Sequence, residues 1–319
     1  MISIVVPAFN EEDGIGELYS RITAAAPSWG EPHELIIIDD GSKDKTFSLL
    51  EDLARHDSRL KILRFSRNFG HQAAVSAGLQ HTSGDVVCVM DADLQDPPEE
   101  LLPFIEKIRD GFDVVYAIRT KRKENIFKRT AYKLYYRILR RLATLDIPID
   151  AGDFCVMRGD VVQAMNQLPE RNRFVRGLRT WVGFRQTGLA YERDARFAGE
   201  SKYTLSRLIR LALDGIINFS YRPLQLITFI GLLVALAALM LVFVVLFLYI
   251  TNTTIFGYNV QEARGWTSIV LILLFSSAVQ LISLGILGEY IGRLYEETKQ
   301  RPIFLVRQRI NFQAPDSSS

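Results

Sequence analysis

We expect an α/β protein from this sequence, with a mostly parallel sheet in its amino-terminal part and two membrane-spanning helices after it. The sheet is predicted because, from residue 1 to about 120, short β-branched apolar runs alternate with amphipathic helical stretches. The two spans are predicted because residues 223–261 and 265–288 contain no charged side chain. Each stretch supplies the roughly 20 apolar residues that cross a bilayer.

The strands and helices of the expected sheet follow one another in chain order. Strands are predicted at 2–6, 35–38, 60–65, 86–90 and 113–117, and helices at 12–26 and 44–54. The run from Val86 to Met90 is apolar at every position, which is typical of a parallel strand buried on both faces. Pro97 and Pro98 follow it, and proline fits the first turn of a helix.

Polar side chains, most of them acidic, collect where these strands end. The first strand is followed by Asn10, Glu11 and Glu12, the second ends in Asp39 and Asp40, and the fourth is followed by Asp91 and Asp93. Open α/β sheets bind ligands at the carboxyl ends of their strands, so three such clusters indicate a nucleotide site. A dinucleotide-binding Rossmann site is disfavoured, because the third glycine of its fingerprint would fall on Tyr19.

Asp91 and Asp93 are the strongest candidates for a metal site. Two carboxylates this close repel each other, so a cation between them is expected. Carboxylate oxygens suit Mg²⁺ or Mn²⁺, and these ions in turn suit phosphates. The alternative is that the two aspartates only cap a loop.

Four motifs, taken together, resemble the polyprenyl-phosphate glycosyltransferases of glycosyltransferase family 2, which have a GT-A (Rossmann-like) fold. The motifs are Pro7-Ala8-Phe9-Asn10-Glu11-Glu12, Asp39-Asp40-Gly41-Ser42-Lys43-Asp44, Ser66-Arg67-Asn68-Phe69-Gly70 and Asp91-Ala92-Asp93-Leu94-Gln95-Asp96-Pro97-Pro98. Bacterial bactoprenol (undecaprenyl-phosphate) glucosyltransferases are the most similar group, with dolichol-phosphate mannose synthase next. The resemblance runs from the first strand through Arg301 and Pro302.

The resemblance implies roles for the residues at the strand ends. Donor-binding residues would be Pro7, Asn10, Glu11, Asp39, Asp40, Asp91 and Gln95. Asp91 and Asp93 would hold Mg²⁺ or Mn²⁺, and Asp93 and Asp153 would be the catalytic residues. Asp153 lies in the segment Ala151 to Arg158, where an ordinary turn or cap residue is the alternative. Because a lipid phosphate is already largely anionic at neutral pH, Asp153 is expected to position the acceptor more than to remove a proton.

Basic residues near the predicted spans suggest the acceptor side. A helix over about 126–143 would have an apolar face, with Arg129, Lys133, Arg137 and Arg140 on the opposite face. Such a helix suits an anionic lipid surface, although it would also suit a basic helix packed on the domain. By resemblance, Arg119, Arg196, Ser201 and Lys202 would bind the acceptor phosphate. The alternative for Arg196 and Lys202 is simple anchoring beside the membrane.

The charge distribution also predicts the topology. The loop over 251–264 carries Arg264 as its single base, whereas both flanks are rich in arginine and lysine. Because basic segments beside membrane spans stay in the cytoplasm, both termini are expected there. We therefore expect a cytoplasmic catalytic domain at 1–202, a juxtamembrane amphipathic helix at 203–222, a membrane region at 223–290 and a basic cytoplasmic tail at 291–319. Within the membrane region, the helices are expected at about 224–250 and 266–288. The location would be a bacterial inner membrane.

The expected function is inverting transfer of a single sugar, glucose from UDP-glucose, to a polyprenyl phosphate. Two alternatives stay open: another donor, of the GDP-mannose or UDP-aminoarabinose type, or a non-enzymatic nucleotide-binding membrane module. A processive polysaccharide synthase is disfavoured, because Arg179-Thr180-Trp181 lacks the glutamine and the Arg-Trp pair of those enzymes. The partners would be the sugar nucleotide, the lipid and the membrane, with no nucleic acid. The resemblance also allows a homo-oligomer, a tetramer.

Overall fold

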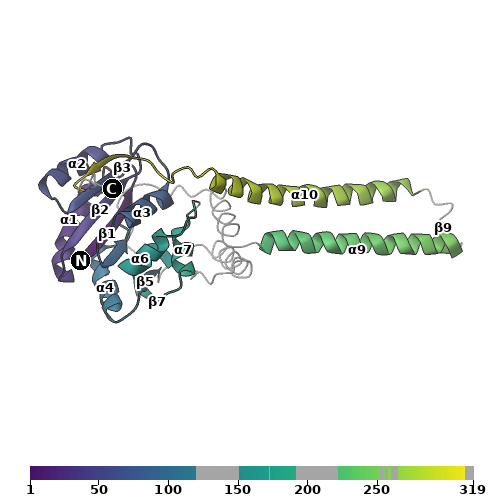
Figure 1. The fold of residues 1–319 in the computed structure, drawn as a ribbon, viewed down its shortest axis with the longest axis horizontal. Coiled ribbons are helices and arrows are strands. Elements are labelled where there is room, and N and C mark those ends of the chain that lie inside the picture. Colours follow the sequence, from purple (N-terminus) through teal and green to yellow (C-terminus); the bar gives the residue numbers. More distant parts are fainter. Residues whose placement is uncertain are drawn as a thin grey trace, which may run out of the picture. The chain divides into compact units, whose positions relative to one another are not determined.

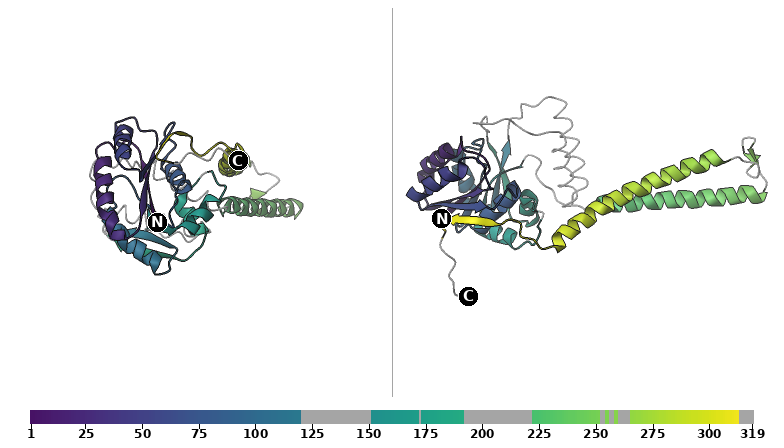
Figure 2. Two further views of the ribbon diagram at one scale, coloured as in Figure 1. Left: turned by 60° about the vertical axis from the view of Figure 1, so that its left-hand side comes forward. Right: turned by 90° about the horizontal axis from the view of Figure 1, so that it is seen from above.

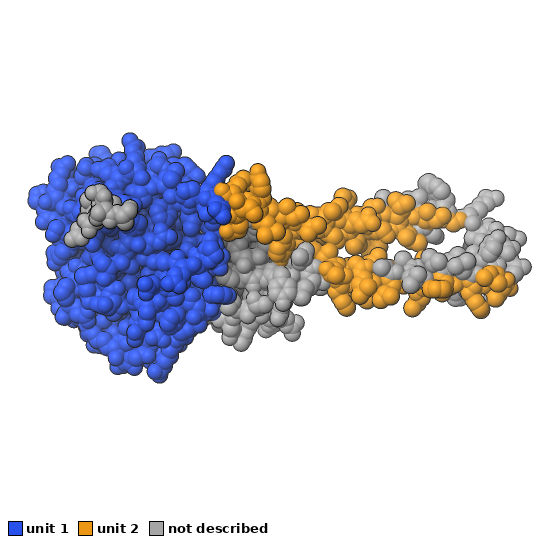
Figure 3. Space-filling view, viewed as in Figure 1, with its two compact units in different colours: residues 1–218, 300–319 blue, residues 219–299 orange. Residues whose placement is uncertain are grey.

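The computed structural model describes residues 1–119, 151–171, 173–191, 222–251, 254–255, 258–259 and 265–312. It divides into two compact units, residues 1–218 with 300–319, and residues 219–299 (Figure 3). Two predicted features lie outside the described residues: the helix at 126–143, and the segment with Arg196, Ser201, Lys202 and nearly all of the helix at 203–222.

An eight-stranded sheet forms the first unit, in the order β10-β3-β2-β1-β4-β6-β5-β7. Its strands are β1 (Ile2–Ala8), β2 (His33–Asp39), β3 (Leu60–Phe65), β4 (Val86–Val89), β5 (Val114–Arg119), β6 (Ala151–Arg158), β7 (Gln186–Tyr191) and β10 (Val306–Ile310). β1 pairs in parallel with β2 and β4, and the pairs β2–β3 and β5–β7 are also parallel. β6 and β10 run antiparallel to their neighbours. The predicted parallel core is therefore confirmed, within a sheet that is mixed.

Helices cover both faces of this sheet (Figures 1 and 2). They are α1 (Ile15–Ala25), α2 (Thr46–His56), α3 (His71–Gln80), α4 (Leu101–Arg109), α6 (Gly159–Asn166) and α7 (Val175–Trp181). Ile2, Ile4 and Val6 of β1 belong to one core cluster with residues of α1, α2 and α4. Alternate strand residues point to opposite faces, so Val5 lies on the other face, where α3 packs. The approach of α3 is close, because a Cβ on Gly78 would overlap the Val5 side chain.

The strand β10 lies in a segment predicted only as a basic tail. It pairs antiparallel with β3, so the carboxyl-terminal segment closes one edge of the sheet. Just before it, the backbone N–H of Ser66 donates to the carbonyl of Leu305 at 2.9 Å, and the rings of Phe65 and Phe304 stack with centroids 5.1 Å apart. Beyond it, the Asn311 side-chain amide lies within hydrogen-bonding distance of the Leu60 carbonyl.

The second unit contains two long helices, α9 (Arg222–Thr251) and α10 (Trp266–Thr298), which lie alongside each other (Figure 1). Between them, β8 (Thr254–Ile255) and β9 (Tyr258–Asn259) form a short hairpin. Both predicted helices are present, and α10 extends ten residues beyond the predicted end at 288. By length and composition, one segment of the described residues, Phe275–Thr298, qualifies as a membrane span.

Candidate active site

The candidate site lies at the carboxyl ends of β1, β2 and β4, which we call the carboxyl edge of the sheet. Asp91 and Asp93 lie two and four residues after the end of β4, and both side chains are half-buried. The residues that alternate with them, Ala92 and Leu94, are buried. This alternation directs the apolar side chains into the core and leaves the carboxylates at the edge. The turn is closed by the backbone N–H of Gln95, which donates to Asp93 Oδ1 at 3.2 Å.

The loops after β1 and β2 are joined by reciprocal hydrogen bonds. Asn10 has a left-handed backbone with φ 55°, and its N–H donates to Ser42 Oγ at 3.0 Å. In return, the Lys43 N–H donates to Asn10 Oδ1 at 2.9 Å. The Glu11 N–H donates to Thr46 Oγ1 at 2.9 Å, while Pro7 is buried in β1. Of these predicted donor-binding residues, Asn10 is exposed and Glu11 is half-buried.

Asp39 and Asp40, also predicted to bind the donor, are buried and hold loop backbone. Asp39 accepts from the Ser42 N–H at 3.0 Å and faces Arg64 Nε at 3.5 Å. Asp40 accepts from the N–H groups of Phe69 and Gly70, at 2.7 and 2.9 Å. Burial raises the pKa of Asp40 although these two N–H groups lower it. Asp40 thus fixes the loop that leads into α3, whereas Asp39 holds the turn after β2.

That loop delivers His71, a residue that the sequence analysis did not select. It is the first residue of α3, and its Nε2 lies 3.3 Å from Asp153 Oδ2 and 3.8 Å from Asp91 Oδ1. Burial lowers the pKa of His71, but the two carboxylates outweigh it and raise the pKa overall. One imidazole therefore stands between the end of β4 and the strand β6.

Asp153, on β6, is also bound by a second residue that the sequence analysis missed. Arg176 of α7 donates from Nε to Asp153 Oδ1 at 2.6 Å and from Nη2 to Oδ2 at 2.8 Å. Burial would raise the pKa of Asp153, but the charge and hydrogen bonds of Arg176, aided by His71, hold it well below its usual value. Asp153 is therefore an ionised carboxylate at neutral pH and a weak proton acceptor.

Negative charge is concentrated around Asp91. Burial raises its pKa to about 6; His71 opposes the shift, whereas Asp153, Asp96 and Asp93 add to it. Among the described residues, no group of three or more His, Cys, Asp or Glu forms a complete protein metal cage. A magnesium-type site needs none, since such ions bind one or two carboxylates together with substrate phosphates and water. The donor set of Asp91 and Asp93 fits a hard divalent cation.

The remaining predicted residues are placed less completely. Gln95 is half-buried beside Asp93, and its neighbour Asp96 is buried and accepts a hydrogen bond from the Tyr191 hydroxyl. Arg119 is the last residue of β5, and its side chain is not among the described parts. Arg196, Ser201 and Lys202 lie outside the described residues. The structure therefore brings together Asp91, Asp93 and Asp153, and leaves the acceptor-phosphate residues as predictions.

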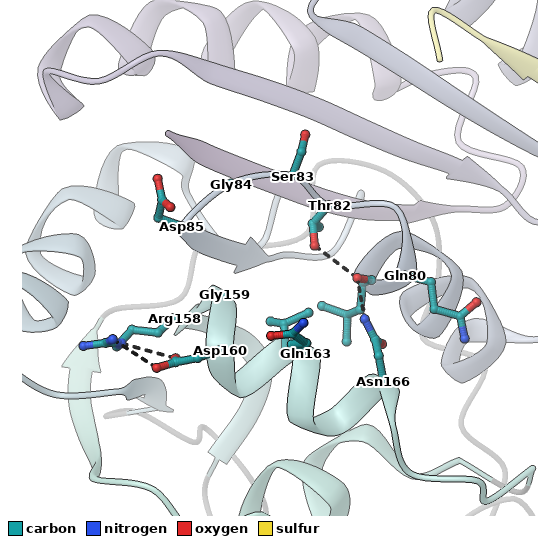
Figure 4. Close-up of a pocket in the computed structure, with 12 residues that line it drawn as sticks. Gln80, Thr82, Ser83, Gly84, Asp85, Arg158, Gly159, Asp160, Gln163 and Asn166 are labelled. Atoms are coloured by element: carbon teal, nitrogen blue, oxygen red, sulfur yellow. Dashed lines mark hydrogen bonds and ion pairs between the residues drawn. The ribbon is translucent and has the colours of Figure 1, made fainter. Parts of the chain in front are cut away.

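A cavity of about 480 Å³ lies elsewhere, at the amino ends of the parallel strands, which we call the amino edge (Figure 4). It is lined by Asp85, just before β4, and by Arg158, at the end of antiparallel β6. Its charged groups are paired, since Arg158 Nη2 lies 3.0 Å from Asp160 Oδ2. The Asn166 amide donates to the Leu79 carbonyl at 2.9 Å. This cavity is thus separated from the carboxyl edge by the length of the strands.

Comparison with known proteins agrees with the geometry. Residues 3–165 match the family described as glycosyl transferase family 2. An uncharacterized glycosyltransferase, YkcC of Bacillus subtilis (strain 168), is 46% identical over 308 residues, which cover 96% of this chain and 93% of that protein. A bactoprenol glucosyl transferase of Shigella phage SfX is 42% identical over 313 residues, which cover 97% of this chain and 99% of that protein.

A more distant similarity is to the solved structure of glucosyl-3-phosphoglycerate synthase from Mycobacterium tuberculosis. The identity is 20% and the TM-score 0.48, over 68% of this chain and 76% of that one. At this level no ligand or residue role is carried over. The sequence relatives share more than 40% identity along nearly the whole chain, and the family match covers half of it. The chain therefore belongs to glycosyl transferase family 2.

Proposed function

We propose that this glycosyltransferase moves one sugar, glucose from UDP-glucose, to a polyprenyl phosphate of the undecaprenyl type at the cytoplasmic face of a membrane. The observation that carries the proposal is the carboxyl edge, where the half-buried Asp91 and Asp93 stand beside the ionised Asp153. The choice of sugar and acceptor is supported by relatives named bactoprenol glucosyl transferases, which are about 40% identical along nearly all of the chain.

On the donor side, Asp91 and Asp93 would hold Mg²⁺ or Mn²⁺. When bound, this ion neutralises the diphosphate as the bond to the anomeric carbon breaks. The joined loops after β1 and β2 would seat the nucleoside through Pro7, Asn10 and Glu11, with Asp39 and Asp40 fixing their shape. Gln95, in the turn that carries Asp93, would complete the donor site.

On the acceptor side, Arg119, Arg196, Ser201 and Lys202 would bind the lipid phosphate. One phosphate oxygen then attacks the anomeric carbon from the side opposite the diphosphate, so the new C–O bond forms with inversion. Because the second pKa of a phosphate monoester is near 6, the attacking oxygen is already largely deprotonated at neutral pH. A strong base is not required, which suits the low pKa of Asp153.

The acceptor's isoprenoid tail stays in the bilayer, so the enzyme has to meet the phosphate at the membrane surface. We propose that α9 crosses the membrane together with α10. Large apolar side chains on both helices are exposed, including Phe243 and Phe247 on α9 and Leu281 and Ile282 on α10. Soluble monomers rarely expose apolar patches of this extent. Both termini and the domain at 1–202 would be cytoplasmic, with the juxtamembrane helix at 203–222 and the tail at 291–319.

The reaction is tested by incubating membranes that contain the chain with undecaprenyl phosphate and a panel of sugar nucleotides. We expect labelled lipid from UDP-glucose, and none after chelation of divalent metal. Label from GDP-mannose or a UDP-aminoarabinose donor instead would establish the alternative specificity. Absence of lipid label with every donor would refute the proposal. Membership of the family already argues against a non-enzymatic nucleotide-binding module.

The topology is tested separately with a cysteine at position 259, in the hairpin between the helices. Asn259→Cys should react with an impermeant thiol reagent from outside intact cells. The native Cys88 and Cys155 are buried, so they give little background. A cysteine at Ser317 should stay unlabelled until the cells are opened, and early labelling there would refute the two-span arrangement.

A further inference from the structure

The contacts of Asp153 are unusual for an acid expected to act on the acceptor. Its two oxygens accept both arms of the Arg176 fork, at 2.6 and 2.8 Å, and His71 Nε2 lies 3.3 Å from Oδ2. A carboxylate offers about four lone-pair directions, and these contacts occupy three of them. The partners come from three separate elements: Asp153 from β6, Arg176 from α7 and His71 from α3.

We propose that Arg176 is a positioning residue for sugar transfer: with His71 it holds Asp153 as a fixed anion, so that Asp153 orients the reacting groups and does not take their proton. This inference rests on the proposed function, whose site it deepens. A bidentate arginine–carboxylate pair fixes the plane of the carboxylate as well as its position. Arg176 would thus set the direction in which Asp153 accepts a hydrogen bond from the substrate.

Burial separates this pair from an ordinary surface salt bridge. The Asp153 side chain is 11% exposed and that of Arg176 is 32% exposed. At the other end of the same strand, Arg158 and Asp160 form a similar pair, but both are about half exposed, at 49% and 48%. Exposed pairs contribute little, whereas a buried carboxylate that loses its partner is strongly disfavoured. Because the two pairs share a two-armed contact, it is the burial of Asp153 that indicates its dependence on Arg176.

His71 gives the pair a link to the donor side. Its Nε2 is 3.3 Å from Asp153 and 3.8 Å from Asp91, which is proposed to hold the metal. If the Asp153 carboxylate shifted, the His71 side chain would therefore transmit the displacement to Asp91, after the end of β4. We infer that Arg176 fixes the separation between the donor and acceptor sides of the reaction. Misplacement by about 1 Å can cost on the order of a hundredfold in rate.

The test is a double-mutant cycle with Arg176→Ala, Asp153→Asn and the two combined. We expect each single variant to lower kcat about 30- to 100-fold, the range for loss of a charge-assisted hydrogen-bonded pair. The combined variant should be no slower than the worse single one, because residues that act as a unit are not additive. The KM for the acceptor and the calorimetric affinity for UDP should change less than about threefold in all of them.

Arg176→Lys keeps the charge but not the fork, so we expect it to recover only a small part of kcat. The matched control is Arg158→Lys, at the far end of β6, which should leave kcat within about twofold of the wild type. Calorimetric binding of UDP shows that each variant is folded. A wild-type rate for Arg176→Lys would overturn the proposal, because the orientation of the fork would then not matter.

Two further outcomes would also overturn it. A combined variant whose loss is the product of the single losses would mean that Arg176 and Asp153 act independently. A large rise in acceptor KM with unchanged kcat would make Arg176 a direct ligand of the acceptor phosphate. Failure of the proposed function can be told apart from failure of this inference, because in the former case the wild-type enzyme itself would transfer no sugar to polyprenyl phosphate. In that event the same cycle, run on the slow hydrolysis of the sugar nucleotide, still measures the coupling.

Discussion

The two ends of the sheet differ in how their acidic side chains are surrounded. At the amino edge, acids meet bases: Glu34 contacts Lys61 Nζ at 2.5 Å, and Asp85 contacts the terminal amine at 3.0 Å. At the carboxyl edge, acids gather around Asp91, whose pKa burial raises to about 6 with help from neighbouring carboxylates. The amino edge therefore stabilises the fold, whereas the carboxyl edge accumulates charge that a bound cation would offset.

The largest effect that this comparison predicts is loss of turnover in Asp93→Ala. Metal stabilisation of the leaving diphosphate amounts to several kcal/mol, so the rate should fall roughly a thousandfold. Transfer to lipid is measured with and without added Mn²⁺, and circular dichroism monitors the fold. If the variant keeps full activity in the presence of a chelator, the proposed metal site at the carboxyl edge is wrong.

The amino edge should show the reverse behaviour, a loss of stability without loss of chemistry. Glu34 is buried and accepts from Lys61, Ser3 and Ser83. Glu34→Ala leaves these donors without an acceptor. It should lower the free energy of unfolding, measured in urea, by about 2–3 kcal/mol, with turnover per folded molecule unchanged. Asp85→Asn is the control and should lower the unfolding midpoint far less, because the pair of Asp85 with the terminal amine is exposed. Equal effects of the two changes would contradict the comparison.

Asp91→Asn should raise stability and abolish transfer, the reverse of the effects expected for Glu34→Ala. It removes one of several like charges, so the metal-free protein should gain about 1 kcal/mol of stability while transfer is lost. Thermal unfolding in the presence of a chelator measures the gain. If Asp91→Asn destabilises the metal-free protein, the carboxyl edge does not hold unfavourable charge.

The smallest predicted effect concerns acid stability at the amino edge. The hydrogen bonds from Arg59 lower the pKa of Asp57 to about 2, although burial opposes this. A lowered carboxylate pKa contributes stability above about pH 4, and this contribution disappears as the pH falls towards 2. Because Arg59 is half exposed, we expect about 1 kcal/mol. Asp57→Asn should flatten the stability profile between pH 4 and 2, and an unchanged slope would contradict the assignment.

The carboxyl edge was predictable from sequence because its signals are local. An apolar run that ends in Asp91 and Asp93 specifies both a buried strand and the place where its polar residues emerge. The partners of Asp153 were not predictable, because His71 and Arg176 lie 82 and 23 residues away in the chain. They meet Asp153 only through tertiary packing, of α7 on β6 and of α3 on β1 and β2. The Ser66-to-Gly70 motif directly before His71 was the available clue.

The strand β10 was missed for a different reason. In isolation, Val306-Arg307-Gln308-Arg309-Ile310 reads as a basic tail, since its three central residues are exposed. What makes it a strand is the open edge of β3, and no property of the segment itself reveals that edge. Edge strands in general tolerate charged, weakly apolar sequences, so composition identifies them poorly.

The late position of β10 has a consequence for biosynthesis. It starts about 240 residues after β3 ends, and α9 and α10 lie between them in the chain. At roughly 5–20 residues per second, the ribosome delivers β10 on the order of 10–50 s after β3. During that interval β3 presents unpaired backbone groups that another strand could join. The nascent domain therefore depends on the prompt arrival of its last strand, and chains truncated after Lys299 should aggregate more readily than complete ones.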